Sequence, residues 1–217
     1  MDTIISSTNE DGYITHRTPE RIYRYNAVRM GLAWPTEHVP AYLCVFGNLY
    51  SRKTLFRVTT MGPIRMIAEA QIDTMSMTEI WDRVLDAAKT LWCEEVYCDL
   101  SPLNIGYREN FRQYTAKMDY KRPFPSLHPA PYADNFIFGF QLGNDWRLTN
   151  KVQGDPDSML GQQLAGFNLM DDFVDYPERR FNAINAYRYV LASFQRNLGL
   201  QENMVPKRRV PLYMVET

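Results

Sequence analysis

The segment from Asp73 to Asp99 constrains the fold more than any other part of the chain. Ser76-Met-Thr-Glu79 has the pattern of a capping box, in which serine accepts from free backbone amides and glutamate reaches back. Behind it, one helical stripe of apolar residues is formed by Ile80, Val84, Leu85, Ala88, Leu91 and Trp92. Strand candidates flank this helix at Ile64–Ile72 and Glu94–Asp99. A helix between two strands allows them to pair in parallel, so the segment predicts an α/β fold.

Two further strand candidates precede this unit. Ala41–Phe46 is a continuous apolar run, typical of a strand buried on both faces, and Thr54–Thr60 is rich in β-forming residues. Polar turns separate these runs from each other and from Ile64–Ile72, so we expect three antiparallel neighbours. The predicted core is strand–strand–strand–helix–strand, in a mixed sheet of about five strands.

The flanking regions carry weaker patterns. Residues 1–40 are predicted to be an irregular arm with a short helix that begins at Thr18-Pro19-Glu20 and ends near Met30. Several arginines share one face of that helix, as either a solvated surface or a docking patch for phosphate or an acidic partner. Residues 41–200 are expected to form a single domain, and residues 201–217 an extended tail.

Within the second half of the chain we expect the following elements. The predictions are a helix over 107–118, an extended proline-rich loop over 121–131, a strand over 135–142 with a hairpin partner at 146–149, a helix from Asp157 or Ser158 to Phe167, and a C-terminal helix over 179–197.

Charge and cysteine content narrow the class of protein. The net charge is −1, so the chain has no large basic field of the kind typical of nucleic-acid binders. Its apolar runs are shorter than the ~20 residues of a membrane span, and residues 1–10 lack the pattern of a secretion signal. The three cysteines, Cys44, Cys93 and Cys98, form no Cys-x-x-Cys pair, which favours buried thiols in a reducing, cytoplasmic compartment.

Aspartates are the strongest candidates for chemistry, because phosphate-loop, dinucleotide-binding and serine-hydrolase motifs are absent. Asp99 ends the strand after the helix, Asp73 and Glu69 end the strand before it, and Asp175 belongs to an acidic cluster before the last helix. Carboxylates from such positions are able to hold two Mg²⁺ or Mn²⁺ ions for phosphodiester cleavage. The alternative is that they cap helices or face solvent.

In this order of elements the chain resembles an RNase H-like fold, and more narrowly the nuclease domain of viral large terminases. The resemblance covers roughly residues 41–197. In that family a helix like the one after Asp73 leads into a strand that ends in a catalytic acid, which matches Val96-Tyr-Cys-Asp99. A final helix preceded by aspartates matches Gly161–Phe167, the acidic cluster and Phe181–Tyr187. The resemblance implies Asp99 and Asp175 as catalytic residues, and Asp99, Asp175 and Asp73 as ligands of Mg or Mn.

The chain also departs from the family. The family's first strand carries a catalytic aspartate, whereas Leu43–Tyr50 contains none, and Asn182 and Asn185 stand where acids are expected. The resemblance then implies a viral protein of the host cytoplasm or virion that lost much of its metal site. It would be weakly catalytic or non-catalytic, and would act mainly by binding DNA or assembly proteins during DNA packaging or particle assembly. Two alternatives stay open: an active metal-dependent nuclease, and an assembly protein unrelated to nucleic acid, with its oligomeric state undetermined.

Overall fold

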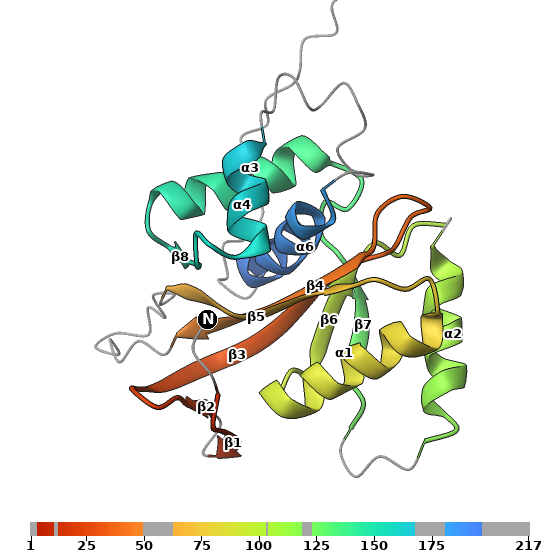
Figure 1. Cartoon of the computed structure of the whole chain (residues 1–217), viewed down its shortest axis with the longest axis horizontal. Coiled ribbons are helices and arrows are strands. Elements are labelled where there is room, and N and C mark those ends of the chain that lie inside the picture. Colours follow the sequence, from red (N-terminus) through yellow and green to blue (C-terminus); the bar gives the residue numbers. More distant parts are fainter. Residues whose placement is uncertain are drawn as a thin grey trace, which may run out of the picture.

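The structure, a computed structural model, describes residues 4–10, 13–49, 63–102, 104–118, 123–167 and 181–196. Within these residues eight strands form one mixed sheet, and helices cover both of its faces (Figure 1). The strands are β1 Ser6–Glu10, β2 Tyr13–Arg17, β3 Ile22–Ala33, β4 Ala41–Leu49, β5 Ile64–Ile72, β6 Glu95–Cys98, β7 Ser126–Pro129 and β8 Val152–Gln153. The helices are α1 Met77–Leu91, α2 Ile105–Thr115, α3 Phe136–Leu148, α4 Met159–Gly166 and α6 Asn182–Arg196.

The long strand β3 is the centre of the sheet. Strand β4 pairs antiparallel with it and β5 pairs antiparallel with β4, while β6 pairs parallel with β3 and β7 pairs parallel with β6. The carboxyl ends of β3, β5, β6 and β7 therefore meet at one edge of the sheet. This arrangement confirms the expected α/β class with a mixed sheet. The order strand–strand–strand–helix–strand is present as β3–β4–β5–α1–β6, but its first strand is β3, where a helix was predicted, and the strand predicted over 54–60 lies outside the described residues.

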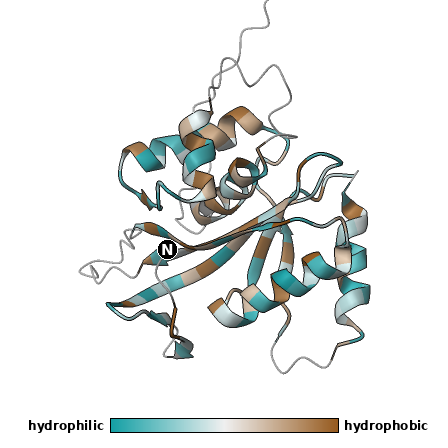
Figure 2. Ribbon diagram, viewed as in Figure 1, coloured by the Kyte–Doolittle hydropathy of each residue, from teal (hydrophilic) through white to brown (hydrophobic). Residues whose placement is uncertain are grey.

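Two apolar clusters hold the layers together. The predicted stripe of α1 is buried against one face of the sheet, together with Phe111 of α2. On the other face, α6 contributes Ala183, Ala186 and Val190 to a second cluster that includes Phe46 of β4. Figure 1 shows α1 and α2 on one side of the sheet and α3, α4 and α6 on the other, and in Figure 2 hydrophobic and hydrophilic segments alternate along α1, as expected of a helix with one buried side.

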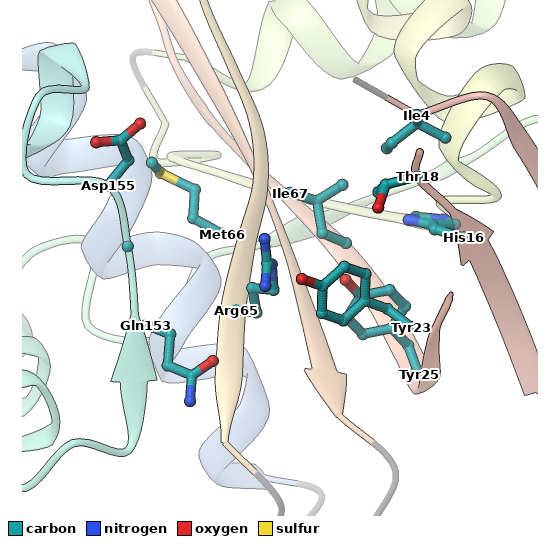
Figure 3. Close-up of a pocket in the computed structure, with 11 residues that line it drawn as sticks. Ile4, His16, Thr18, Tyr23, Tyr25, Arg65, Met66, Ile67, Gln153 and Asp155 are labelled. Atoms are coloured by element: carbon teal, nitrogen blue, oxygen red, sulfur yellow. The ribbon is translucent and has the colours of Figure 1, made fainter. Parts of the chain in front are cut away.

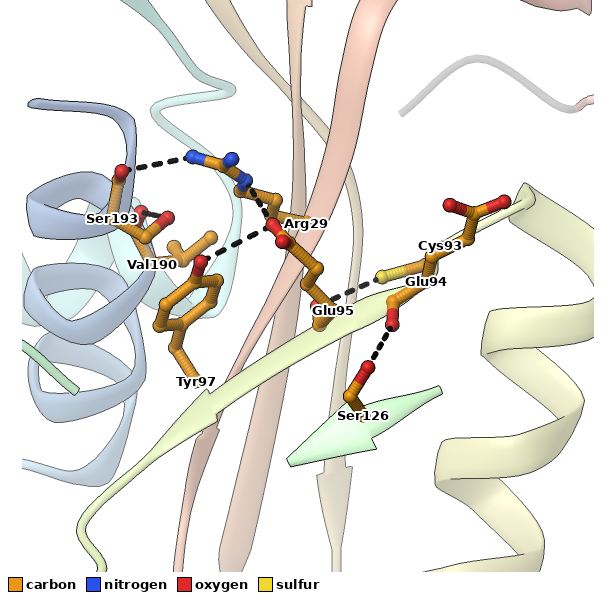
Figure 4. A network of polar contacts seen from close by, with 8 residues as sticks. All are labelled: Arg29, Cys93, Glu94, Glu95, Tyr97, Ser126, Val190 and Ser193. Carbon is orange, nitrogen blue, oxygen red and sulfur yellow. Dashed lines mark hydrogen bonds and ion pairs between the residues drawn. The ribbon is translucent and has the colours of Figure 1, made fainter. Parts of the chain in front are cut away.

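A buried arginine also fastens α6 to the sheet (Figure 4). Arg29 of β3 is 4% exposed, and its Nη1 donates to the Ser193 carbonyl oxygen at 2.8 Å. Its Nε lies 2.6 Å from Oε2 of Glu95 in β6. Tyr97 donates to the same carboxylate, and the Phe194 ring lies 4.9 Å from the Arg29 guanidinium carbon. One cation thus joins two strands and the last helix.

The prediction of an irregular arm with a helix before residue 40 was wrong. Strands β1 and β2 form a hairpin there, and β3 occupies most of the segment that was expected to be helical. From Val28 to Ala33 the strand is buried on both faces, and the burial of these residues outweighs the helical spacing of the arginines. Residue 40 therefore does not separate an arm from the domain.

Three expectations for the second half of the chain were also wrong. The apolar segment from residue 135 is helix α3, whose first turn is capped by the Asn135 side chain accepting from the Phe138 amide, and residues 146–149 end that helix instead of pairing with it. The proline-rich segment contains strand β7. Ser76 begins α1 as expected, but its side chain makes no capping bond.

The remaining elements agree with the sequence in type. Strands β4, β5 and β6 and helices α2, α4 and α6 lie where they were predicted, and the Ser158 side chain caps α4 by accepting from the Gly161 amide. The strand expected over 54–60, the acidic cluster and the tail lie outside the described residues. Among the described helices, none has the length and apolarity that a membrane crossing requires.

Candidate functional site

A cleft of about 640 Å³ opens at the edge where the parallel strands end. Strands β3 and β6 run side by side, with Leu32 opposite Cys98, so Trp34 and Asp99 emerge next to each other. The cleft walls also include Asn182, Asn185 and Arg188 from α6 and Asp134 from the segment before α3. Strand ends of this kind are the usual place for function in α/β sheets.

Asp99 is at the predicted position, but both of its carboxylate oxygens are already engaged. Oδ1 accepts from the Ser101 amide and Oδ2 from the Asn104 side-chain amide, each at 2.8 Å. The backbone oxygen of Asp99 accepts from Nε1 of Trp34 at 2.7 Å. Asp99 therefore organises the turn that leads from β6 into α2.

The first turns of α6 supply amides where the family resemblance implied acids. Asn182 is 4% exposed, and its Nδ2 donates to the carbonyl oxygens of Trp34 at 3.0 Å and Pro40 at 2.6 Å. Asn185 is 2% exposed, and its Oδ1 accepts from Nε of Arg188 at 2.9 Å. These contacts tie the start of α6 to the loop between β3 and β4.

Arg188 gives the cleft a buried positive charge. The residue is 1% exposed, and its terminal nitrogens donate to the carbonyl oxygens of Tyr132 at 2.8 Å and Ala133 at 3.0 Å. Its guanidinium carbon lies 5.0 Å from the Phe136 ring and 4.6 Å from the Tyr189 ring. Backbone carbonyls and aromatic faces thus stabilise a cation in the wall of the cleft that Asp99 also lines.

The other acids named from the sequence do not join Asp99. Asp73 follows β5 and does not line the cleft. Because β4 and β3 lie between β5 and β6, strand ends three positions apart are separated by roughly 14 Å. Glu69 accepts from the Met159 and Leu160 amides at 2.9 and 3.1 Å, and it also accepts from the Tyr42 hydroxyl, so it caps α4. Asp175 lies outside the described residues, and its role stays a prediction.

A divalent metal site does not fit the described part of the cleft. No group of three acidic, histidine or cysteine side chains among the described residues is arranged to hold an ion. The Asp99 carboxylate already accepts two hydrogen bonds, and the positive charge of Arg188 in the same cleft disfavours a bound cation. The strands adjacent to β6 are β3 and β7, and neither Ile22–Ala33 nor Ser126–Pro129 contains an aspartate or a glutamate.

The cysteines are buried thiols, as expected, and offer no nucleophile. All three are free, and burial raises the pKa of the Cys93 thiol to about 12 and also raises the pKa of Cys44 and Cys98. A thiol that stays protonated at neutral pH is a poor nucleophile.

Arg188 is the cleft residue that sequence reasoning missed. The sequence contained a signal, because Asn182, Asn185 and Arg188 recur every three residues and the positions between them are Ala, Ile and Tyr. A polar stripe on the buried side of a helix indicates a specific network, because buried polar groups require partners.

Comparison with known proteins gives a likeness in fold. No protein-family model and no curated protein sequence matches the chain. The large terminase g2p nuclease domain of bacteriophage SPP1, solved with bound Mn, has a TM-score of 0.49 and 16% identity, covering 80% of this chain and 88% of that one. A mutant nuclease domain of the large terminase subunit gp2 of bacterial virus Sf6, solved with manganese and beta-thujaplicinol, has a TM-score of 0.45 and 11% identity, covering 75% and 86%. The yeast mitochondrial Holliday junction resolvase Ydc2 has a TM-score of 0.38 and 10% identity, covering 78% and 83%.

The chain is similar in fold to large terminase nuclease domains. At such low identity the likeness assigns no residue, metal or activity to this chain.

Proposed function

We propose that this chain is an RNase H-like domain that acts by binding and does not cleave phosphodiesters. The observation that carries the proposal is the buried Arg188 cation in the cleft wall, where a metal-dependent nuclease needs converging carboxylates. The neutral amides of Asn182 and Asn185 extend the same pattern along α6.

The hydrogen bonds of the cleft support a structural role for its polar groups. Asn182 joins α6 to the end of β3, Arg188 joins α6 to the segment before α3, and Asp99 joins β6 to the start of α2. Each bond satisfies a buried or half-buried group, so the network stabilises the cleft in one shape. A rigid cleft is suited to docking a partner.

The setting we propose is DNA packaging or particle assembly in a virus, with DNA or another assembly component as the partner. The sequence resemblance around Asp99 and the last helix supports this setting. The protein would then work in the host cytoplasm or in the virion.

The competing function is an active nuclease that combines Asp99 with Asp175. Purified protein is incubated with supercoiled plasmid and Mn²⁺, beside the variants Asp99→Asn and Asp175→Asn, with Asp73→Asn as the matched control. We expect no nicking by any of the four proteins and no Mn²⁺ binding by calorimetry at millimolar metal. Nicking by the wild type that disappears in Asp99→Asn and persists in Asp73→Asn overturns the proposal.

The binding role is tested separately, in EDTA, so that a metal contributes nothing. Fluorescence anisotropy of labelled duplex and single-stranded DNA measures the DNA partner directly. Association that weakens as salt is raised supports a DNA-docking domain. No association with either DNA removes DNA as the partner.

A further inference from the structure

Two exposed arginines that the cleft does not use lie together on one face of the β2–β3 hairpin. Arg17 ends β2, and Arg24 lies in the first half of β3. The two strands pair antiparallel, with Arg17 opposite Ile22 and Thr15 opposite Arg24. Residues two apart share a face of a strand, so Arg17 and Arg24 are diagonal neighbours on one face, with Cβ atoms about 7 Å apart.

The other face of this hairpin packs on the body of the protein. Ile14 and Tyr25 belong to the same buried cluster as the stripe of α1, and Nε2 of His16 lies 3.0 Å from the Leu91 carbonyl oxygen at the end of that helix. Figure 3 shows the rings of His16, Tyr23 and Tyr25 on this side. These rings are therefore on the opposite face from the two arginines.

Strand β1 extends the outer face into a polar array. Ser6 lies opposite Arg17, and Thr8 lies opposite Thr15. Directly opposed residues point to the same side of a sheet. Two rows result, which we call the arginine face: Ser6, Arg17 and Ile22 in the first, and Thr8, Thr15 and Arg24 in the second. The threonines are half-buried and the other members are exposed, so the face presents two guanidinium groups and three hydroxyls.

These polar groups are not committed to other contacts within the part of the chain that the structure describes. The side chains of Arg17 and Arg24 make no ion pair, hydrogen bond or ring contact there, and the three hydroxyls make no hydrogen bond. The turn between the strands is fixed by Thr18 instead, whose hydroxyl donates to the Arg21 carbonyl oxygen and accepts from the Arg21 amide. The arginine face is therefore available to a partner.

The surroundings of the arginine face favour an anionic partner. Residues 13–26 contain three arginines, of which Arg21 is exposed in the turn, against one acid, Glu20, a net charge of +2 in a chain whose net charge is −1. Strand β3 leads from this face to the cleft, and the nine residues from Arg24 to Ala33 separate the two by roughly 30 Å. In Figure 1, β1 and β2 lie at the bottom of the view, away from α3, α4 and α6. The arginine face is thus a surface separate from the cleft.

We propose that the arginine face binds the phosphate backbone of duplex DNA. Arginine and hydroxyl side chains make many of the phosphate contacts in protein–DNA complexes, and both rows are built from such groups. Protein partners are anchored by large apolar side chains, and Ile22 is the one apolar member of the two rows. The proposal rests on the binding role with DNA as the partner, and it assigns the backbone contact to a surface outside the cleft.

The composition of the arginine face also distinguishes duplex from single-stranded DNA. Proteins hold single strands by stacking bases on aromatic rings, and the two rows contain no aromatic residue. A duplex has the higher density of phosphate charge, so backbone contacts alone favour it. Binding at this face should be independent of base sequence, because phosphates carry no sequence information.

Fluorescence anisotropy in EDTA tests the proposal with the intact chain and a labelled duplex of mixed sequence. Two phosphate contacts predict that the logarithm of the association constant falls against the logarithm of salt concentration with a slope of about −1.8, and a third contact from Arg21 brings the slope to about −2.7. The duplex should bind more tightly than either of its single strands.

Matched double variants show whether the arginine face is responsible. Arg17→Gln combined with Arg24→Gln should weaken binding about tenfold or more at low salt, and the slope should become shallower by about 1.8. The control combines Arg108→Gln with Arg112→Gln, two exposed arginines of α2, and changes the net charge by the same amount. The control should bind within about threefold of the wild type, because charges far from the contact are screened. Circular dichroism confirms that both variants are folded.

Four results would overturn the proposal: no duplex binding at about 0.1 mM protein in low salt, a folded Arg17→Gln/Arg24→Gln variant that binds like the wild type, an equal loss in the control, or tighter binding of poly-L-glutamate than of DNA. The last result would assign the face to an acidic protein. Plasmid nicking would overturn the binding-only function and leave the result for the arginine face unchanged. DNA binding that ignores the Arg17 and Arg24 substitutions would refute this face and leave DNA as a partner of the chain.

Discussion

Replacing Gly31 with alanine should destabilise the chain strongly, because helix α6 rests directly on this glycine. Gly31 lies in the central strand β3, between Cys44 of β4 and Tyr97 of β6. A Cβ at this position would lie 2.0 Å from the carbonyl oxygen of Ala186 and 2.8 Å from its carbonyl carbon. Ordinary contact begins at 3.4 Å, so the helix would have to withdraw by 3.4 − 2.0 = 1.4 Å.

The magnitude follows from what the withdrawal disturbs. The obstructing atoms belong to helix backbone, which cannot rotate away as a flexible side chain would. Overpacking of a core costs about 1–3 kcal/mol and occasionally more, and we expect about 3 kcal/mol or more at this rigid contact. For a chain of this size, that corresponds to a fall in Tm of roughly 6–12 °C.

Urea unfolding followed by circular dichroism measures the change in the free energy of unfolding. Gly106→Ala is the matched control, because a Cβ there meets nothing within 4 Å and the residue lies in helix α2. The control should stabilise the chain by about 0.5–1 kcal/mol. If Gly31→Ala stayed within about 0.5 kcal/mol of the wild type, an ordinary surface effect, the direct seating of α6 on β3 would be refuted.

Two further predictions concern buried polar groups. Arg29→Met keeps an unbranched stem but leaves the Ser193 carbonyl and the Glu95 carboxylate without their cation, so the free energy of unfolding should fall by about 2–3 kcal/mol in urea titrations. A loss below about 0.5 kcal/mol would mean that this network does not anchor α6. His16 has a lowered pKa in the folded state, so the unfolded chain binds its proton first as pH falls through 6.5, and stability should decrease below that pH. Unfolding titrations between about pH 7 and 5 should show a shallower slope for His16→Gln, and equal slopes would contradict a neutral buried ring.

The sequence predicted an element correctly where its residues followed either a helical or a strand periodicity and not both. The stripe of α1 admits only a helix, and the uninterrupted run of β4 fits a strand buried on both faces. The prediction for β3 failed because the arginines share a helical spacing while Tyr23 and Tyr25 alternate as in a strand. Pairing with β4 and β6 decides between these patterns, and those partners are distant in sequence.

Helix α3 was mispredicted in the opposite sense, as a strand. Its first residues form a short apolar run that fits a strand or a buried helix equally well. The deciding contacts come from α6, since Gly139 and Gly143 lie against Arg188 and Tyr187. The position of Asp99 was predictable because a strand end is a local feature. Its carboxylate bonds, to Ser101 and Asn104, are also local, whereas its bond to Trp34 and its place in the cleft beside α6 depend on segments distant in sequence.

The hydrogen bonds of the cleft also show why single substitutions should not create a metal site there. An aspartate in place of Asn182 would turn a donor into an anion facing the carbonyl oxygens of Trp34 and Pro40, which are acceptors themselves. An aspartate in place of Asn185 would be tolerated, because its carboxylate would pair with Arg188. The negative charge that a metal ion requires would then be neutralised by the arginine. Removing Arg188 would leave two backbone carbonyls that now accept from it without their donors. The amides and the cation are therefore mutually dependent, so we expect that no single substitution to an acid creates a metal site at this edge of the sheet.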